Sequence, residues 1–110
     1  MSILGAHNLK LKLILYEGGI RFLKQAISDL QAGDLAAHNR NIEKTQNIIT
    51  ELQSALNTDP GDQTARNIRQ LYDLISDNLA EAARTHDPKI LYEMADILQE
   101  LSQTWRQATY

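Results

Sequence analysis

The sequence predicts an all-α fold, an antiparallel up-down-up-down four-helix bundle, on three observations. Turn and helix-ending residues divide the 110-residue chain into four segments. Each segment repeats apolar residues at alternating spacings of three and four, the pattern with which a helix buries one face. No stretch shows the period-two alternation of a β-strand. We therefore expect residues 1–110 to form a single domain, with helices at about 9–32, 35–57, 63–84 and 88–107.

Capping and turn residues set these boundaries. Gly33 is placed to end the first helix as a C′ glycine, and Asp34 can cap the second. Residues 57–62 (NTDPGD) collect the residue types that favour turns. Asp87 followed by Pro88 is a helix start signal, with Asp87 as the N-cap and Pro88 at the first helical position. Proline is tolerated there because a backbone N–H at that position has no partner within the helix. The short connections favour antiparallel neighbours.

Four apolar seams predict the core of the bundle, since seams of this spacing suit helices that cross at about 20°. The first two seams comprise Leu9, Leu13, Tyr16, Ile20, Leu23, Ile27 and Leu30, then Leu35, His38, Ile42, Thr45, Ile49, Leu52 and Leu56. The other two comprise Ala65, Ile68, Tyr72, Ile75, Leu79 and Ala82, then Leu91, Met94, Leu98, Leu101, Trp105 and Ala108. We expect substantial burial of Tyr16, Ile49, Tyr72, Leu98 and Trp105.

Composition excludes several classes of function. The net charge is −3, with eleven Lys and Arg scattered among fourteen Asp and Glu, whereas proteins that bind nucleic acid usually carry a basic stripe. The absence of cysteine excludes disulfides and thiolate chemistry. The longest uninterrupted aliphatic run is Leu13–Leu15, far below the roughly 20 residues that span a bilayer. We therefore expect no nucleic-acid partner, no membrane insertion and a location in the cytoplasm.

The sequence contains no catalytic or metal-binding motif with the residue spacing that such sites require. His7, His38 and His86 lie one to a segment, and none has a histidine partner three or four residues away that would form a metal pair. No nucleophile elbow and no glycine-rich phosphate loop is present. His38 lies on the second seam, which predicts a partly buried, hydrogen-bonded histidine. We expect no enzyme activity, no metal and no cofactor.

Two segments carry more apolar surface than a bundle helix needs. In the first, apolar and glycine positions beyond the seam widen the apolar arc to roughly 240°; these positions are Leu11, Ile14, Leu15, Gly18 and Phe22. In the third, a flanking row consists of Asn67, Leu71, Leu74 and Asn78. Such flanks are either a wide core or a surface that a partner covers. Gly18 and Gly19 likewise indicate either close helix packing or a flat place for a partner's backbone, and both interpretations stay open here.

Residues 13–18 (LILYEG) and 21–26 (RFLKQA) carry the pattern "L-x-L-Y-[ED]-G … F-L-x-x-A". This pattern resembles the signature of the FliS family, whose members are bacterial flagellar export chaperones that bind flagellin. Residues 48–56 resemble its "I-I-x-E-L-x-x-x-L" pattern, and residues 65–73 (ARNIRQLYD) its "A-x-N-L-x-x-L-Y-[DE]" pattern. The motifs occur in the family's order over about residues 9–106. Before Leu9 the chain departs from the family, with Ala-His-Asn in place of Ala-Ser-Pro.

The resemblance implies a cytosolic chaperone that binds the disordered C-terminal segment of flagellin. Binding is expected to prevent premature polymerisation of flagellin and to keep it competent for flagellar type III export. Components of the flagellar export gate are the further partners that the resemblance implies. With the surplus apolar surface, it predicts client contacts from Leu11, Leu15, Gly18, Phe22, Asn67, Leu71, Leu74 and Asn78, and from the motif residues Tyr16 and Tyr72. The alternative is a homo-oligomeric or regulatory helical module that has no secreted client and buries the same surface against a second copy of itself. A weak homodimer would be one form of such a module.

Overall fold

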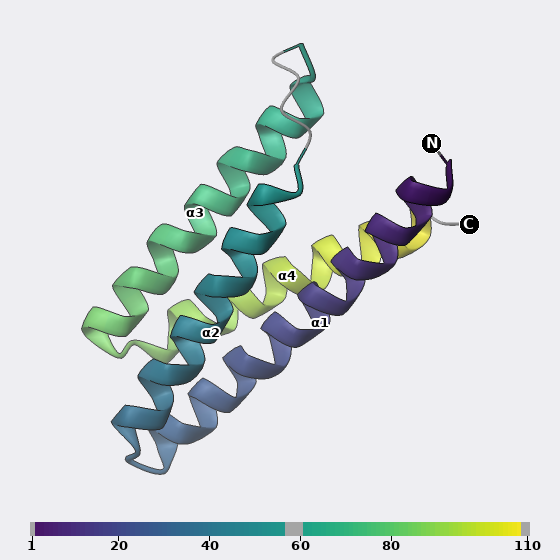
Figure 1. The fold of residues 1–110 in the computed structure, drawn as a ribbon. Helices are drawn as coiled ribbons and strands as arrows, with labels where there is room; N and C mark the ends of the chain where they lie inside the picture. Colours follow the sequence, from purple (N-terminus) through teal and green to yellow (C-terminus); the bar gives the residue numbers. More distant parts are fainter. Residues whose placement is uncertain (1, 57–60, 109–110) are drawn as a thin grey trace.

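The computed structural model describes residues 2–56 and 61–108, with side chains for residues 9–56 and 61–107. These residues form four helices, α1 (Ser2–Gln31), α2 (Leu35–Ser54), α3 (Gln63–Thr85) and α4 (Pro88–Ala108), and no strand within the described ranges. Consecutive helices run in opposite directions, and α1 packs beside both α2 and α4 (Figure 1). Helix α3 also packs against α2 and α4, so that α1 and α3 lie diagonally opposite each other. The predicted bundle is confirmed.

The helix ends follow the predicted caps. Gly33 has φ +79° and closes α1 with two backbone bonds, from Gly33 N to the Leu30 carbonyl (3.1 Å) and from Asp34 N to the Asp29 carbonyl (2.9 Å). This pair of bonds is a Schellman motif. Asp34 then accepts a bond from Ala37 N at 3.0 Å, as an N-cap does.

The later helices start in the same way. Asp62 accepts a bond from Ala65 N at 3.1 Å at the start of α3, and Asp87 accepts one from Lys89 N at 3.0 Å at the start of α4. At the end of α3, His86 has φ +59°, the left-handed conformation more often adopted by glycine. The start signal at Asp87 and Pro88 is therefore confirmed.

Two predicted boundaries were wrong. Helix α1 begins at Ser2, not at residue 9, because an apolar seam marks only the part of a helix that packs against its neighbours, and the helix continues before Leu9. Helix α2 ends at Ser54, not at residue 57, and Ala55 forms its C-cap. Residues 57–60 of the predicted turn lie outside the described residues.

Most seam residues form the core as expected. Tyr16, Ile49, Tyr72 and Leu98 are completely buried. Trp105, also expected to be substantially buried, is only partly so and packs at the margin of the core. Leu35 was expected on the second seam but is 47% exposed. It is the first residue of α2, next to the capping turn, and the buried residues of this helix begin only at His38.

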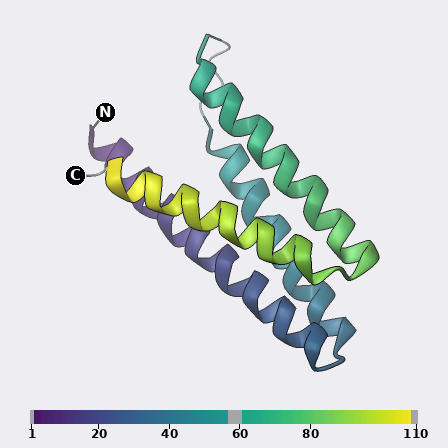
Figure 2. The same cartoon turned by 180° about the vertical axis from the view of Figure 1, so that it is seen from behind.

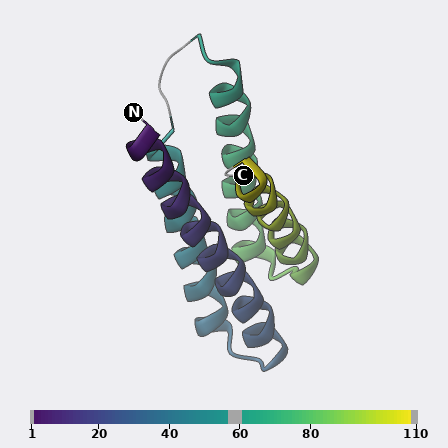
Figure 3. The ribbon, with the colours of Figure 1, turned by 90° about the vertical axis from the view of Figure 1, so that its right-hand side faces the viewer.

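The bundle is not equally tight along its length. Toward the end that holds both chain termini, the α1–α4 pair diverges from the α2–α3 pair, as the front and back views show (Figures 1 and 2). The side view shows the same end with the first turns of α3 standing above α4 (Figure 3). Cavities between the helices lie at this end, as described below.

The Gly33 turn supplies a test of the capping interpretation. Replacing Gly33 with alanine should lower the free energy of unfolding by about 1–2 kcal/mol, because a Cβ is strained at positive φ. Nothing lies within 4 Å of the added carbon, so steric contact contributes nothing. Gly33→Asn is the matched control, and it should cost less because asparagine tolerates this conformation. Urea denaturation measures both, and equal stability of Gly33→Ala and the parent would contradict the account.

Candidate functional site

The α1 flank is partly exposed in its N-terminal half. Leu11 is 47% exposed and Ile14, which lies on the adjoining face, is 54% exposed. Leu15 is partly buried and packs against the core. Phe22 is also partly buried, with the Lys44 ammonium of α2 at 5.4 Å from its ring centroid. The part of this flank open to a partner is therefore centred on Leu11 and Ile14.

Gly18 and Gly19 lie against neighbouring helices. A Cβ at Gly18 would stand 3.4 Å from the Ile48 side chain of α2, and one at Gly19 would stand 3.1 Å from the Leu98 side chain of α4. Both glycines are buried. Close helix packing therefore accounts for this pair, and Gly18 lies beneath Ile48 rather than open to a partner's backbone.

Tyr16 and Tyr72 are completely buried, and their hydroxyls are hydrogen-bonded to each other between α1 and α3. The Trp105 indole N–H of α4 donates to the Tyr16 hydroxyl at 3.0 Å. Burial raises the pKa of both tyrosines above the usual value of 10.0, and for Tyr72 the bond with Tyr16 raises it further. The two tyrosines thus lie in the core beneath the exposed residues of α1 and α3, and the bond from Trp105 to Tyr16 fixes the orientation of the Trp105 ring.

The α3 row alternates in exposure. Leu71 is partly buried against the core, and Leu74 is 48% exposed. The Asn67 side-chain oxygen accepts a bond from Gln63 of its own helix at 2.8 Å, and the Asn78 amide donates to the Leu74 carbonyl at 2.8 Å. Both asparagines thus have partners on α3 itself. Because α1 and α3 are diagonal in the bundle, the structure does not bring the two predicted rows into one groove.

A hollow at the divergent end joins three of the helices and was missed from the sequence. Its larger part, about 300 Å³, is lined by Thr64, Ile68, Leu101, Thr104 and Trp105. A smaller part of about 140 Å³ shares Thr64, Ile68 and Trp105 and adds Lys12, Leu56, Asp62 and Ala65. We call the two parts together the end hollow. Its apolar lining residues are seam positions, so periodicity marked them as core, and the divergence of the helices leaves Ile68, Leu101 and Trp105 only partly buried.

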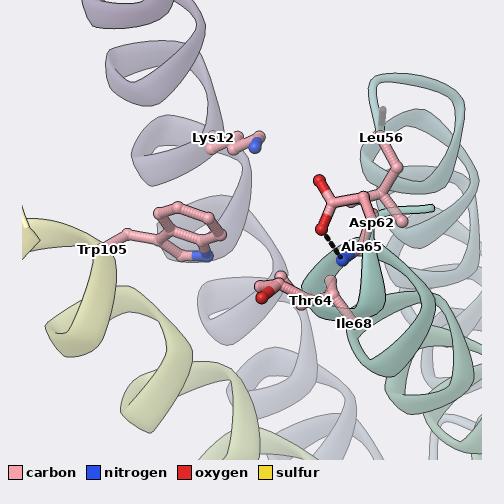
Figure 4. Close-up of a pocket in the computed structure, with 7 residues that line it drawn as sticks. All are labelled: Lys12, Leu56, Asp62, Thr64, Ala65, Ile68 and Trp105. Atoms are coloured by element: carbon pink, nitrogen blue, oxygen red, sulfur yellow. Dashed lines mark hydrogen bonds between the residues drawn. The ribbon is translucent and has the colours of Figure 1, made fainter. Parts of the chain in front are cut away.

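One cation lies at the rim of the end hollow. The Lys12 ammonium is 4.4 Å from the centroid of the Trp105 ring, within the range of a cation–π contact. Figure 4 shows Lys12 beside this ring and Asp62 across the hollow from it, where the Asp62 carboxylate bonds to Ala65 N. Partial burial lowers the pKa of Lys12. Among the described residues, no carboxylate lies within ion-pair distance of Lys12.

The opposite end of the bundle holds two of the histidines. His38 is buried and donates from Nδ1 to the Ala26 carbonyl at 2.8 Å, as the seam position predicted. His38 and His86 come from different segments of the sequence, and the structure places the centroids of their rings 5.3 Å apart. No group of three or more His, Asp or Glu side chains that could hold a metal occurs among the described residues. Among the described residues, none of the four helices carries an apolar stretch that could span a bilayer.

Comparison with known proteins gives a consistent result. The family model "Flagellar protein FliS" matches residues 1–110. A protein of Vibrio cholerae named flagellar secretion chaperone FliS is 30% identical over 98 residues, which cover 89% of this chain and 72% of that protein. A protein of the same name from Bacillus subtilis is 29% identical over 99 residues, covering 90% and 73%.

A solved structure shows the same fold. The crystal structure of a bacterial flagellar chaperone superposes with a TM-score of 0.86 at 25% sequence identity. The superposition covers 93% of this chain and 83% of that one.

Proposed function

We propose that this chain, which belongs to the FliS family of flagellar secretion chaperones, binds the disordered C-terminal segment of flagellin in the cytoplasm and holds it unpolymerised for type III export. The family is one of chaperones and not of enzymes. The observation that carries the client-binding step is the apolar surface left open on the bundle. Leu11, Ile14 and Leu74 are each about half exposed beside a well-packed core.

The physical basis of the proposal is coupled folding and binding. A disordered segment gains free energy when its apolar side chains leave water, and part of that gain offsets the entropy lost on ordering. A rigid bundle costs little ordering of its own, so the exposed side chains on α1 and α3 offer a preformed surface. Held in this way, the segment lacks the free apolar face with which it would join other copies. The step needs no nucleotide.

We propose that the client contacts the two rows from opposite sides of the bundle, as a segment that wraps around it. This follows from the diagonal placement of α1 and α3. On α1 the contact residues are Leu11, Leu15 and Phe22, and on α3 they are Asn67, Leu71, Leu74 and Asn78. Tyr16, Gly18 and Tyr72 act from beneath, by fixing the positions of the helices that carry these rows.

Leu11→Asp tests this site more cleanly than a change at Leu15, because Leu15 also packs against the core. We expect the variant to keep the stability of the parent and to bind a peptide of the flagellin C-terminal segment about tenfold more weakly, a loss of about 1.4 kcal/mol. A charge in the contact surface would lose apolar burial and be poorly solvated. Isothermal titration calorimetry measures the affinity, and circular dichroism the stability.

Gln99→Asp is the control, because it places the same charge at an exposed position of α4 away from both rows. If the parent, Leu11→Asp and Gln99→Asp all bind the peptide with equal affinity, then α1 is not part of the client site. Sedimentation of the free chain tests the competing use of the same surface, since a homodimer would show a mass that rises with concentration.

A further inference from the structure

We propose, on the basis of the client-binding function above, that the end hollow receives one large apolar side chain of the client segment and that Lys12 pairs with an acidic side chain next to it. The client sequence recognised here is thus an aliphatic or aromatic residue beside an aspartate or glutamate.

The apolar part of this proposal rests on the walls of the hollow. Ile68, Leu101 and Trp105 line the larger part, about 300 Å³, together with Thr64 and Thr104. Since liquid water occupies about 30 Å³ per molecule, a volume of this size holds on the order of ten waters against walls that offer them few hydrogen bonds. Their displacement by an apolar side chain is favourable. The volume suits one or two side chains, not a folded domain.

The Trp105 wall is rigid enough to serve as a binding surface. Its indole N–H bonds to the Tyr16 hydroxyl, which in turn bonds to the Tyr72 hydroxyl. Because both tyrosines are completely buried, this chain of bonds ties the ring of α4 to the centre of the bundle. A ring held in this way loses little side-chain entropy when a partner packs against it.

The charge of the occupant follows from the two ionised groups at the rim. Asp62 caps α3, and its carboxylate is stabilised there by the Ala65 N–H and by the positive end of the helix dipole. Lys12 is partly buried against the Trp105 ring and has no carboxylate within ion-pair distance among the described side chains. An acidic group on the occupant would supply the counter-charge that Lys12 lacks among the described residues.

Trp105 is also the probe for the test, because it is the single tryptophan of the chain. We would titrate the full chain with a tryptophan-free peptide of the C-terminal segment of flagellin from the same cell, and follow Trp105 emission and heat. Copies of the peptide carry Asn or Gln in place of one Asp or Glu at a time. We expect the emission to shift on binding, and one neutralised peptide to bind the parent about tenfold more weakly.

Five variants of the chain locate the contact. Lys12→Met keeps the aliphatic stem and removes the charge, and it should weaken binding of the unchanged peptide about tenfold, whereas Lys12→Arg should stay within twofold. Lys10→Met makes the same change of net charge at an exposed neighbour and should have no effect. Thr64→Phe fills the hollow and should weaken binding at least tenfold, whereas Ala80→Phe, at an exposed position of α3 away from the proposed contacts, should not.

The decisive comparison is a double-mutant cycle. The neutralised peptide that loses affinity for the parent should lose none for Lys12→Met, since the pair is already broken. If the parent binds the peptide but Lys12→Met and Thr64→Phe bind it equally well, the hollow is not the site, and the proposed function stands without it. If the parent binds no peptide, the proposed function itself fails. A Trp105 emission that changes on dilution without peptide would assign the hollow to a second copy of this chain and overturn the proposal.

Discussion

Replacing Leu98 with alanine is expected to lower the free energy of unfolding by about 2–5 kcal/mol, through lost apolar burial and the cavity that remains. Leu98 of α4 is completely buried, and its Cδ1 lies 3.1 Å from the place where a Cβ of Gly19 would stand. The side chain therefore fills the space that the glycine leaves between α1 and α4. Few neighbours can move into the gap, which places the cost toward the upper part of that range.

Chemical denaturation in urea measures this loss. Leu74→Ala is the matched control, because it makes the same truncation on a residue that is 48% exposed, and it should cost far less. A loss below about 1 kcal/mol for Leu98→Ala, or equal losses for the two variants, would contradict the packing described for α1 and α4.

Tyr16→Phe is expected to cost about 2–3 kcal/mol, and Tyr72→Phe about 1 kcal/mol. The order follows from the hydrogen bonds. The Tyr16 hydroxyl is bonded to both the Tyr72 hydroxyl and the Trp105 indole, whereas among the described residues the Tyr72 hydroxyl is bonded to Tyr16 alone. The first variant therefore breaks two bonds of the buried chain and the second breaks one. Thermal or urea unfolding of both variants checks the order, and a larger loss for Tyr72→Phe would contradict it.

The same tyrosines give the stability a dependence on alkaline pH. Burial raises the pKa of Tyr16 and of Tyr72 in the folded chain above the usual 10.0. Above about pH 10 the unfolded chain therefore releases these protons while the folded chain keeps them. The stability present below pH 10 is lost as the pH rises beyond it. The fall in unfolding free energy above pH 10 should be shallower for Tyr72→Phe than for the parent.

Most of the fold could be predicted because local signals and the seams agree. Gly33 and Asp34 occur where a left-handed C′ residue and an N-cap are needed, and the structure has both. The start of α1 could not be predicted from the seam, because the seam first shows at Leu9 and a helix can extend beyond the part that packs against its neighbours. Leu35 shows the limit of periodicity, since a residue at the helix start can keep the phase of the seam without being covered.

The candidate site was predicted only in part. The periodicity identified surplus apolar residues such as Leu11 and Leu74, and these are exposed. It could not decide which neighbour covers Gly18, because that depends on Ile48 of another helix. The end hollow was not predictable for a similar reason. Trp105 and Ile68 have the spacing of core residues, and the divergence of the two helix pairs, which no local pattern encodes, leaves them open.

Calorimetry combined with circular dichroism shows whether this bundle binds a disordered flagellin segment and orders it. The full chain would be titrated with the C-terminal segment of flagellin from the same cell at several temperatures. We predict saturable binding with a negative heat-capacity change and a helical signal above the sum of the two free components, because apolar surface is buried while the segment folds. No binding, or binding with neither a heat-capacity change nor a gain in helicity, would contradict the account.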